Sequence, residues 1–131
     1  MNLRLDSKTE TCGYNYGIYK VEGMEKTGVP VMLEAVRSQI GEVRTLQIDF
    51  PHDRDNYVEP LYFSSYDDYM KSASEIDFGK VEKITFAGEV DSKRVVACLD
   101  VGFSTLTVSA RGNEMESRVS NNINNGLPRQ R

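Results

Sequence analysis

The chain has 131 residues, of which 39% are hydrophobic and 27% charged, and a formal net charge of −4. This length fits one soluble domain that can bury its own core. No apolar run approaches the ~20 residues of a membrane-spanning helix, and the polar N-terminus lacks the apolar core of a secretory signal. The acidic balance argues against nucleic-acid binding, which typically needs a basic stripe.

The two cysteines, Cys12 and Cys98, lie far apart and match no metal-binding or redox spacing. We therefore expect two free thiols in a reducing, cytoplasmic compartment. A disulfide between the two residues is the alternative. Cys98 stands in the middle of a predicted strand, where we expect a buried and unreactive thiol.

The N-terminal half alternates between strand and helix patterns. Residues 3–5 indicate a short edge strand, and the aromatic and β-branched residues of 14–22 predict a second strand. Apolar residues at helical spacing predict a helix over 29–40, with a proline in its first turn and a glycine after its end. The alternative is that residues 29–33 continue as an edge strand. Residues 42–50 then alternate like a half-buried strand.

Residues 64–74 predict a short helix before the densest apolar pattern begins. Either Ser64 or Ser65 can cap its N-terminus, and Asp67 and Asp68 lie near the positive end of its dipole. Its apolar stripe would consist of Tyr66, Tyr69, Met70 and Ala73.

The clearest pattern spans residues 80–111 and predicts three strands of an antiparallel meander. The middle strand, 94–101, is apolar on both faces, which is typical of a central strand covered on both sides. On the third strand Leu106, Val108 and Ala110 face inward, while alternating threonines and serines face solvent.

Asn113 followed by Glu116 resembles a capping box and predicts a C-terminal helix. Residues 121–131 predict a frayed helix end that runs into a linker. We therefore expect a single domain over 1–124 and a polar tail or linker over 125–131, which suggests a piece of a longer protein. The fold class is α+β, with a mainly antiparallel sheet, a C-terminal meander at about 80–111, and two to three short helices packed on one face.

Motifs that carry chemistry are scarce. The single histidine, His52, stands beside Asp49, Asp53 and Asp55, so it is a candidate general base or metal ligand. Its loop setting favours a solvated side chain, because no nucleophile or oxyanion donor accompanies it. Residues 53–56 begin like a calcium loop but lack its later glycine and glutamate. We predict no catalytic residue, metal site or cofactor, with a small enzyme using His52 and nearby carboxylates as an alternative.

Negative charge and tyrosines are concentrated in residues 49–77. This segment has eight acidic and two basic residues, a net charge of −6. Tyrosine is enriched in binding interfaces, and a negative patch would steer a basic partner. We therefore predict a non-catalytic protein-binding module of inhibitor, immunity or regulatory type. It would engage a basic partner surface through Asp53, Asp55, Tyr57, Glu59, Tyr62, Tyr66, Asp67, Asp68 and Tyr69.

A structural or self-assembly domain of a larger protein is the other alternative. In that case an edge of the meander would pair with a second copy to form a homodimer. The contact would involve Thr105, Thr107 and Ser109 on the third strand, or the N-terminal edge strand.

Overall fold

A computed structural model describes residues 1–25, 28–51, Asp55 and residues 57–128 of the chain. Within this part the first half of the chain forms β1 (Asn2–Thr11), β2 (Tyr14–Glu22), α1 (Val29–Gln39), β3 (Glu42–Asp49), β4 (Leu61–Phe63) and α2 (Tyr66–Ser72). After α2 come the short 3-10 helices η2 (Ala73–Glu75) and η3 (Phe78–Lys80), followed by β5 (Lys83–Val90), β6 (Lys93–Asp100), β7 (Thr105–Arg111) and α3 (Asn113–Gly126).

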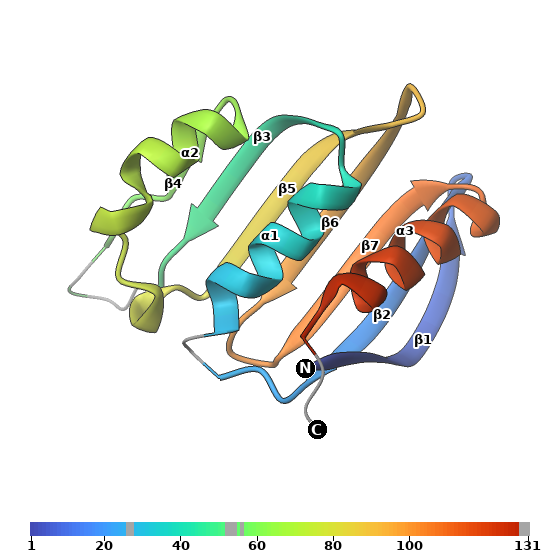
Figure 1. Cartoon of the computed structure of the whole chain (residues 1–131), viewed down its shortest axis with the longest axis horizontal. Helices are drawn as coiled ribbons and strands as arrows, with labels where there is room; N and C mark the ends of the chain where they lie inside the picture. The colour runs from blue at the N-terminus through green and yellow to red at the C-terminus, as the bar shows by residue number, and fades with distance from the viewer. Residues whose placement is uncertain (26–27, 52–54, 56, 129–131) are drawn as a thin grey trace.

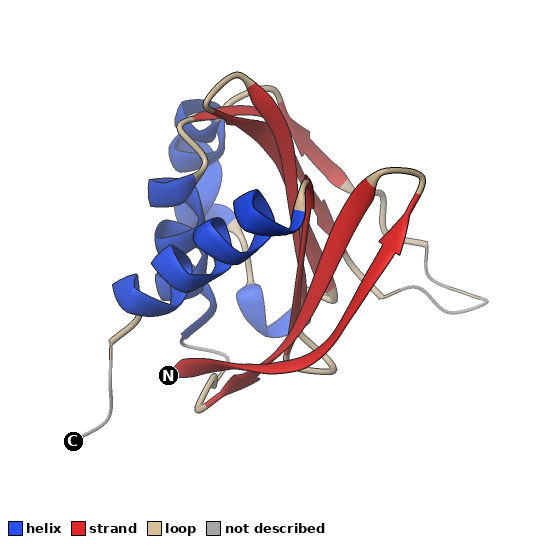
Figure 2. Ribbon diagram, turned by 90° about the vertical axis from the view of Figure 1, so that its right-hand side faces the viewer, coloured by secondary structure: helices blue, strands red, loops and turns tan. Residues whose placement is uncertain are grey.

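All seven strands belong to one antiparallel sheet in the order β1-β2-β7-β6-β5-β3-β4. Figure 1 looks onto the face that carries α1, α2 and α3. The view from the side places these helices on one side of the sheet (Figure 2). The predicted α+β class, with a C-terminal meander and helices on one face, is confirmed, and the sheet is not closed into a barrel. No helix among the described residues is long and apolar enough to cross a membrane.

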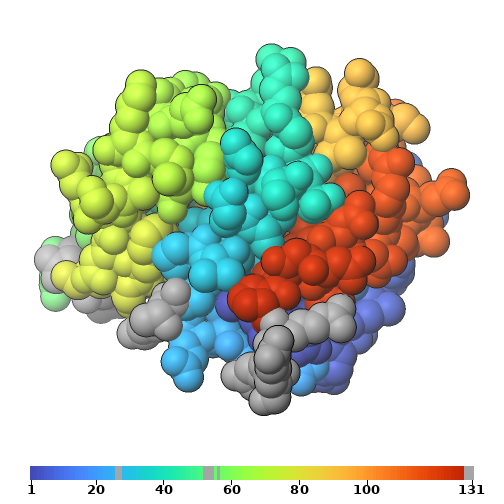
Figure 3. Space-filling model, in the orientation of Figure 1, coloured from blue at the N-terminus to red at the C-terminus, as the bar shows by residue number. Residues whose placement is uncertain are grey.

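The hydrophobic core lies between the sheet and the helices, which cover the sheet in the space-filling view (Figure 3). The predicted stripe of α1 is buried, with Val29, Met32 and Leu33 fully inside. The inward residues of the three meander strands oppose it, as their alternation predicted. These are Ile84, Phe86, Val95, Ala97, Leu99, Leu106, Val108 and Ala110.

The meander is internal to the sheet, which corrects two expectations. Because β5 also pairs with β3 and β7 also pairs with β2, the meander has no free edge for a second copy. The strand β6 is central, but helices cover only one of its faces. Val96 and Cys98 are half-buried on the other face, so Cys98 is not a core thiol. Both Cys98 and Cys12 are unpaired.

The edge strands are β1 and β4, and the sequence indicated neither of them well. The strand β1 has ten residues, with a register shift between Leu5 and Ser7. It shows little apolar alternation because nearly all of it is exposed, and its charged side chains protect the edge from pairing with other chains. The strand β4 has only three residues, too few for a period to appear.

The helix α2 begins as predicted, since the Asp68 backbone N–H donates to Ser65 Oγ at 3.1 Å. Its predicted stripe is wrong at Met70, which is 54% exposed, whereas Tyr69 is 3% exposed. A seven-residue helix buries only one narrow face. Met70 directly follows buried Tyr69 in the sequence, so its side chain points to a different side of the helix.

The helix α3 corrects the predicted capping box. Its N-cap is Gly112, with φ of 96°, and no side chain caps it from within the helix. Glu116 is fully buried and does not return to the helix start. The helix also continues to Gly126, and Leu127 is buried beyond it, so residues 121–126 are not frayed.

Candidate functional site

The predicted site residues lie on α2, on β4 and in the loop before β4. Asp53 lies outside the described residues, as does His52, so any role of either remains a prediction. The eight that the structure describes are Asp55, Tyr57 and Glu59 before β4, Tyr62 on β4, and Tyr66, Asp67, Asp68 and Tyr69 on α2.

Five of the six residues 57–62 are exposed, and four of these five have large apolar side chains. Tyr57 is 68% exposed, Tyr62 65%, Val58 46% and Leu61 37%, and Glu59 between them is also exposed. We call these five residues the tyrosine edge. Because β4 is an outer strand of the sheet, this surface lies where another chain can approach.

Two of the predicted tyrosines are structural instead. Tyr69 is buried, and its ring lies 5.9 Å from that of Phe63 and 5.3 Å from that of Tyr66. The Tyr66 hydroxyl donates to Glu34 Oε2 on α1 at 2.7 Å. Burial raises the pKa of both phenols, and the nearby Glu34 carboxylate adds to both shifts. Tyr66 and Tyr69 therefore anchor α2 to the body of the protein.

The two aspartates of α2 also differ in their surroundings. Asp68 accepts from Ser64 Oγ at 3.0 Å and lies 3.8 Å from Lys71 Nζ. Asp67 is exposed in the first helical turn, where its negative charge interacts favourably with the positive end of the helix dipole. Of this pair, Asp67 is the better source of negative charge for a partner.

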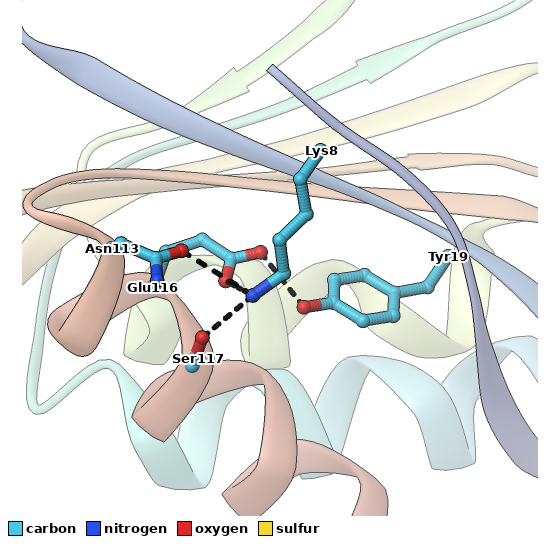
Figure 4. Close-up of polar contacts among 5 residues, drawn as sticks. All are labelled: Lys8, Tyr19, Asn113, Glu116 and Ser117. Carbon is cyan, nitrogen blue, oxygen red and sulfur yellow. Dashed lines mark hydrogen bonds and ion pairs between the residues drawn. The ribbon is translucent and has the colours of Figure 1, made fainter. Parts of the chain in front are cut away.

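A buried polar cluster on the opposite half of the sheet was not predicted. Glu116 on α3 is 0% exposed, and its Oε1 accepts from the Tyr19 hydroxyl at 2.7 Å (Figure 4). Lys8 Nζ on β1 lies 3.4 Å from Glu116 Oε2 and donates to Ser117 Oγ at 2.7 Å and to Asn113 Oδ1 at 3.4 Å. We call these five residues the Glu116 cluster.

Gly17 on β2 makes room for the buried carboxylate. A Cβ at this position would lie 1.4 Å from Glu116 Oε1 and 2.7 Å from the ring of Tyr19. Burial raises the pKa of Tyr19 to about 12, and the Glu116 carboxylate adds to the shift. A glycine among aromatic and β-branched residues of a strand is the sequence signal that could have indicated this close approach.

The Glu116 cluster joins β1, β2 and α3, and its geometry suits a clamp better than a reactive site. With Glu116 fully buried, a dissolved substrate cannot reach the carboxylate in this arrangement. The side chain of Lys8 is 35% exposed, so its ion pair with Glu116 is partly screened by solvent, and the hydrogen bond from the Tyr19 hydroxyl is the contact that the buried carboxylate makes inside the protein. The cluster therefore holds α3 over the β1–β2 hairpin.

A metal centre finds no support in the described part of the chain, where no group of three or more His, Cys, Asp or Glu residues is placed to hold an ion. The surface with the strongest features of a binding site is the tyrosine edge.

Comparison of the chain with protein-family models, with curated proteins and with solved structures finds no match.

Proposed function

We propose that the chain is a non-catalytic protein-binding module, of inhibitor, immunity or regulatory type, that engages a basic surface of a partner protein. The observation that carries this proposal is the tyrosine edge, where four of the six residues 57–62 expose a large apolar side chain at an outer strand of the sheet. Contiguous exposed apolar surface marks interaction sites, and tyrosine provides contact area at a low cost in side-chain entropy.

The surroundings of the tyrosine edge support a partner of opposite charge. Asp55, Glu59 and Asp67 are exposed along the same segment, which has a net charge of −6 over residues 49–77. Acidic groups around an apolar centre accelerate encounter with a basic surface and select against acidic ones. Tyr66 and Tyr69 hold α2 against the body of the protein, so exposed Asp67 is presented from a fixed helix, which lowers the entropy cost of binding.

A cytoplasmic location forms part of the proposal. Its support is that Cys12 is exposed and Cys98 half-buried, and that neither is paired. Free thiols persist where the environment is reducing. Trapping of both thiols with a maleimide in intact cells, before lysis, would agree with this location, whereas thiols that are already oxidised would contradict it.

Affinity capture with matched variants tests the binding surface. Immobilised wild-type chain, a Tyr57→Ser/Tyr62→Ser variant and a Phe103→Ser control are compared for the proteins they retain. Phe103 is 74% exposed in the β6–β7 turn, away from the tyrosine edge, so it controls for the loss of an exposed aromatic ring.

The expected partner is a basic protein that the wild type and the Phe103 control retain equally. Its affinity should fall at least tenfold in the double tyrosine variant, as for an interface centred on aromatic residues, and should fall with rising salt. Equal retention by all three proteins, or an acidic partner, would contradict the proposal.

A further inference from the structure

The sheet face turned away from the helices has an uncharged centre. The pairing registers place six side chains of the three central strands next to one another on this face, all of them half-buried. We call them the central band: Thr107 and Ser109 on β7, Val96 and Cys98 on β6, and Thr85 and Ala87 on β5. On β2, Tyr16 and Ile18 extend the band toward the N-terminal edge.

Charged residues flank the central band at both of its ends. One row across the strands joins Lys20 on β2 to Asp49 on β3, with three strands between them. At the other end of the band, Arg111 on β7 and Glu89 on β5 lie on either side of β6. Lys20 and Arg111 therefore each have an acidic counterpart at the mirrored position about β6. Exposed Lys83 on β5 does not, because Thr105 occupies its mirrored position.

We propose that two copies of the chain pack face to face through this uncovered sheet face, about a twofold axis that runs along β6. Such an axis exchanges β2 with β3 and β7 with β5, because β6 is the middle strand of seven. Lys20 of one copy then faces Asp49 of the other, and Arg111 faces Glu89. A twofold interface requires this kind of self-complementary surface.

The size of the face suits such a dimer. Seven strands at a spacing of about 4.8 Å and four rows of side chains cover roughly 30 Å by 20 Å. The resulting area, on the order of 600 Å² in projection, approaches the ~800 Å² per partner of a standard interface. Sheets stack about 10 Å apart with their strands within about 30° of alignment. Small side chains such as those of the central band permit this distance.

The charged residues of β6 itself do not oppose this arrangement. Arg94 and Asp100 lie at the two ends of the strand, and each has an opposite charge directly beside it on β5. Glu89 is paired with Arg94 and Lys83 with Asp100, which offsets the repulsion between the like charges on the axis. Asp100 is also engaged within its own chain, because its Oδ1 accepts from the Phe103 backbone N–H at 3.1 Å. Tyr62 on β4 lies on this face, whereas Leu61 lies on the face that the helices cover, so the dimer interface and the tyrosine edge share Tyr62.

Sedimentation equilibrium over a wide range of concentrations tests the proposal first. The wild-type chain should have the mass of a dimer, and Thr107→Lys should weaken association at least tenfold. Val31→Lys is the matched control, since Val31 is 42% exposed on α1 on the other side of the sheet, and this variant should remain dimeric. A wild-type chain that is monomeric up to millimolar concentration would overturn the proposal.

Two further measurements test the orientation of the copies. Lys20→Asp should weaken the dimer at least tenfold, and adding Asp49→Lys to the same chain should restore it, because the twofold brings the two exchanged charges together. In a Cys12→Ser chain, a short bifunctional maleimide should link two copies through Cys98, which lies on the proposed axis, because stacked sheets are too far apart for a direct disulfide. Failure of the exchanged pair to restore association, or of Cys98 to form the link, would overturn this axis.

Discussion

Glu116 can be buried because Gly17 on β2 has no side chain. At Gly17 the carboxylate occupies the volume that a Cβ would fill, and even alanine would overlap it. The carboxylate is tolerated there because the Tyr19 hydroxyl donates to one oxygen and Lys8 lies beside the other. Gly17 is thus required by close approach and not by its backbone freedom.

Replacement of Gly17 by alanine tests this account. We expect Gly17→Ala to lower the free energy of unfolding by about 1–3 kcal/mol, as overpacking does in cores. Gly41→Ala is the control, because nothing lies within 4 Å of a Cβ built at Gly41, and its effect should stay within about 0.5 kcal/mol. Urea unfolding followed by circular dichroism measures both.

The combination with Glu116→Ala separates crowding from other effects. The single Glu116→Ala change should also destabilise the chain, because the buried Tyr19 hydroxyl loses its acceptor on Glu116. The double variant should cost clearly less than the two single changes together, since the added methyl group then enters vacated space. Strictly additive costs would show that Gly17 and Glu116 do not compete for the same volume.

At the scale of elements, helix caps were predicted with uneven success. Two adjacent serines preceded α2, and the sequence allowed either to cap it, whereas the structure selects Ser65. For α3 the same reasoning failed, because Glu116 has a buried phenol to bind that the local sequence does not reveal. A capping pattern describes only local hydrogen bonds, and tertiary contacts decide whether the side chain uses them.

The two serines before α2 provide a matched pair of variants. Ser65→Ala should lower the free energy of unfolding by about 1 kcal/mol, because the Asp68 N–H loses its acceptor. Ser64→Ala removes only a hydrogen bond to the exposed Asp68 carboxylate and should cost a few tenths of a kcal/mol. Urea unfolding of both proteins decides this, and an equal or larger cost for Ser64→Ala would contradict the assigned cap.

Strands were predictable where one face is buried and the other is not. The strands β5 and β7 alternate clearly, and their buried residues match the inward faces that the pattern indicated. Only the first residues of the edge strand β1 were predicted from the sequence, because exposure on both sides removes the alternation of apolar and polar residues. Because β6 has small apolar residues on both faces, its sequence predicted a strand covered on both sides. On the uncovered face, the neighbouring strands alone half-bury Val96 and Cys98.

At the scale of the whole molecule, the acidic tyrosine-rich segment divides into two parts that composition cannot separate. Tyr66 and Tyr69 are three residues apart on a helix, so one face carries both, and that face packs on Phe63 and α1. Tyr57 and Tyr62 stand outside the helix and remain exposed. The net charge of a segment does not indicate which of its side chains contact the core.

Three tyrosines whose pKa is raised by burial also make the stability of the whole protein depend on pH in the alkaline range. Burial raises the pKa of Tyr19, Tyr66 and Tyr69 in the folded chain, to about 12 for Tyr19, whereas the unfolded phenols keep a pKa of about 10. Above pH ~10 the unfolded chain releases phenolic protons that the folded chain retains. The three phenols therefore contribute their full stabilisation below pH ~10, and the free energy of unfolding falls as the pH rises toward 12.

Urea unfolding at several pH values between about 8 and 11.5 should show this fall. Tyr19→Phe loses the hydrogen bond to Glu116 at every pH, so the slope of stability against pH is the informative quantity, and it should become shallower. Tyr14→Phe is the control, because the hydrogen bond and charge of Arg111 lower the pKa of half-buried Tyr14. Removing Tyr14 should leave the slope unchanged or make it steeper. A slope that Tyr19→Phe does not reduce would show that the Tyr19 phenol is not protected from ionisation by the fold.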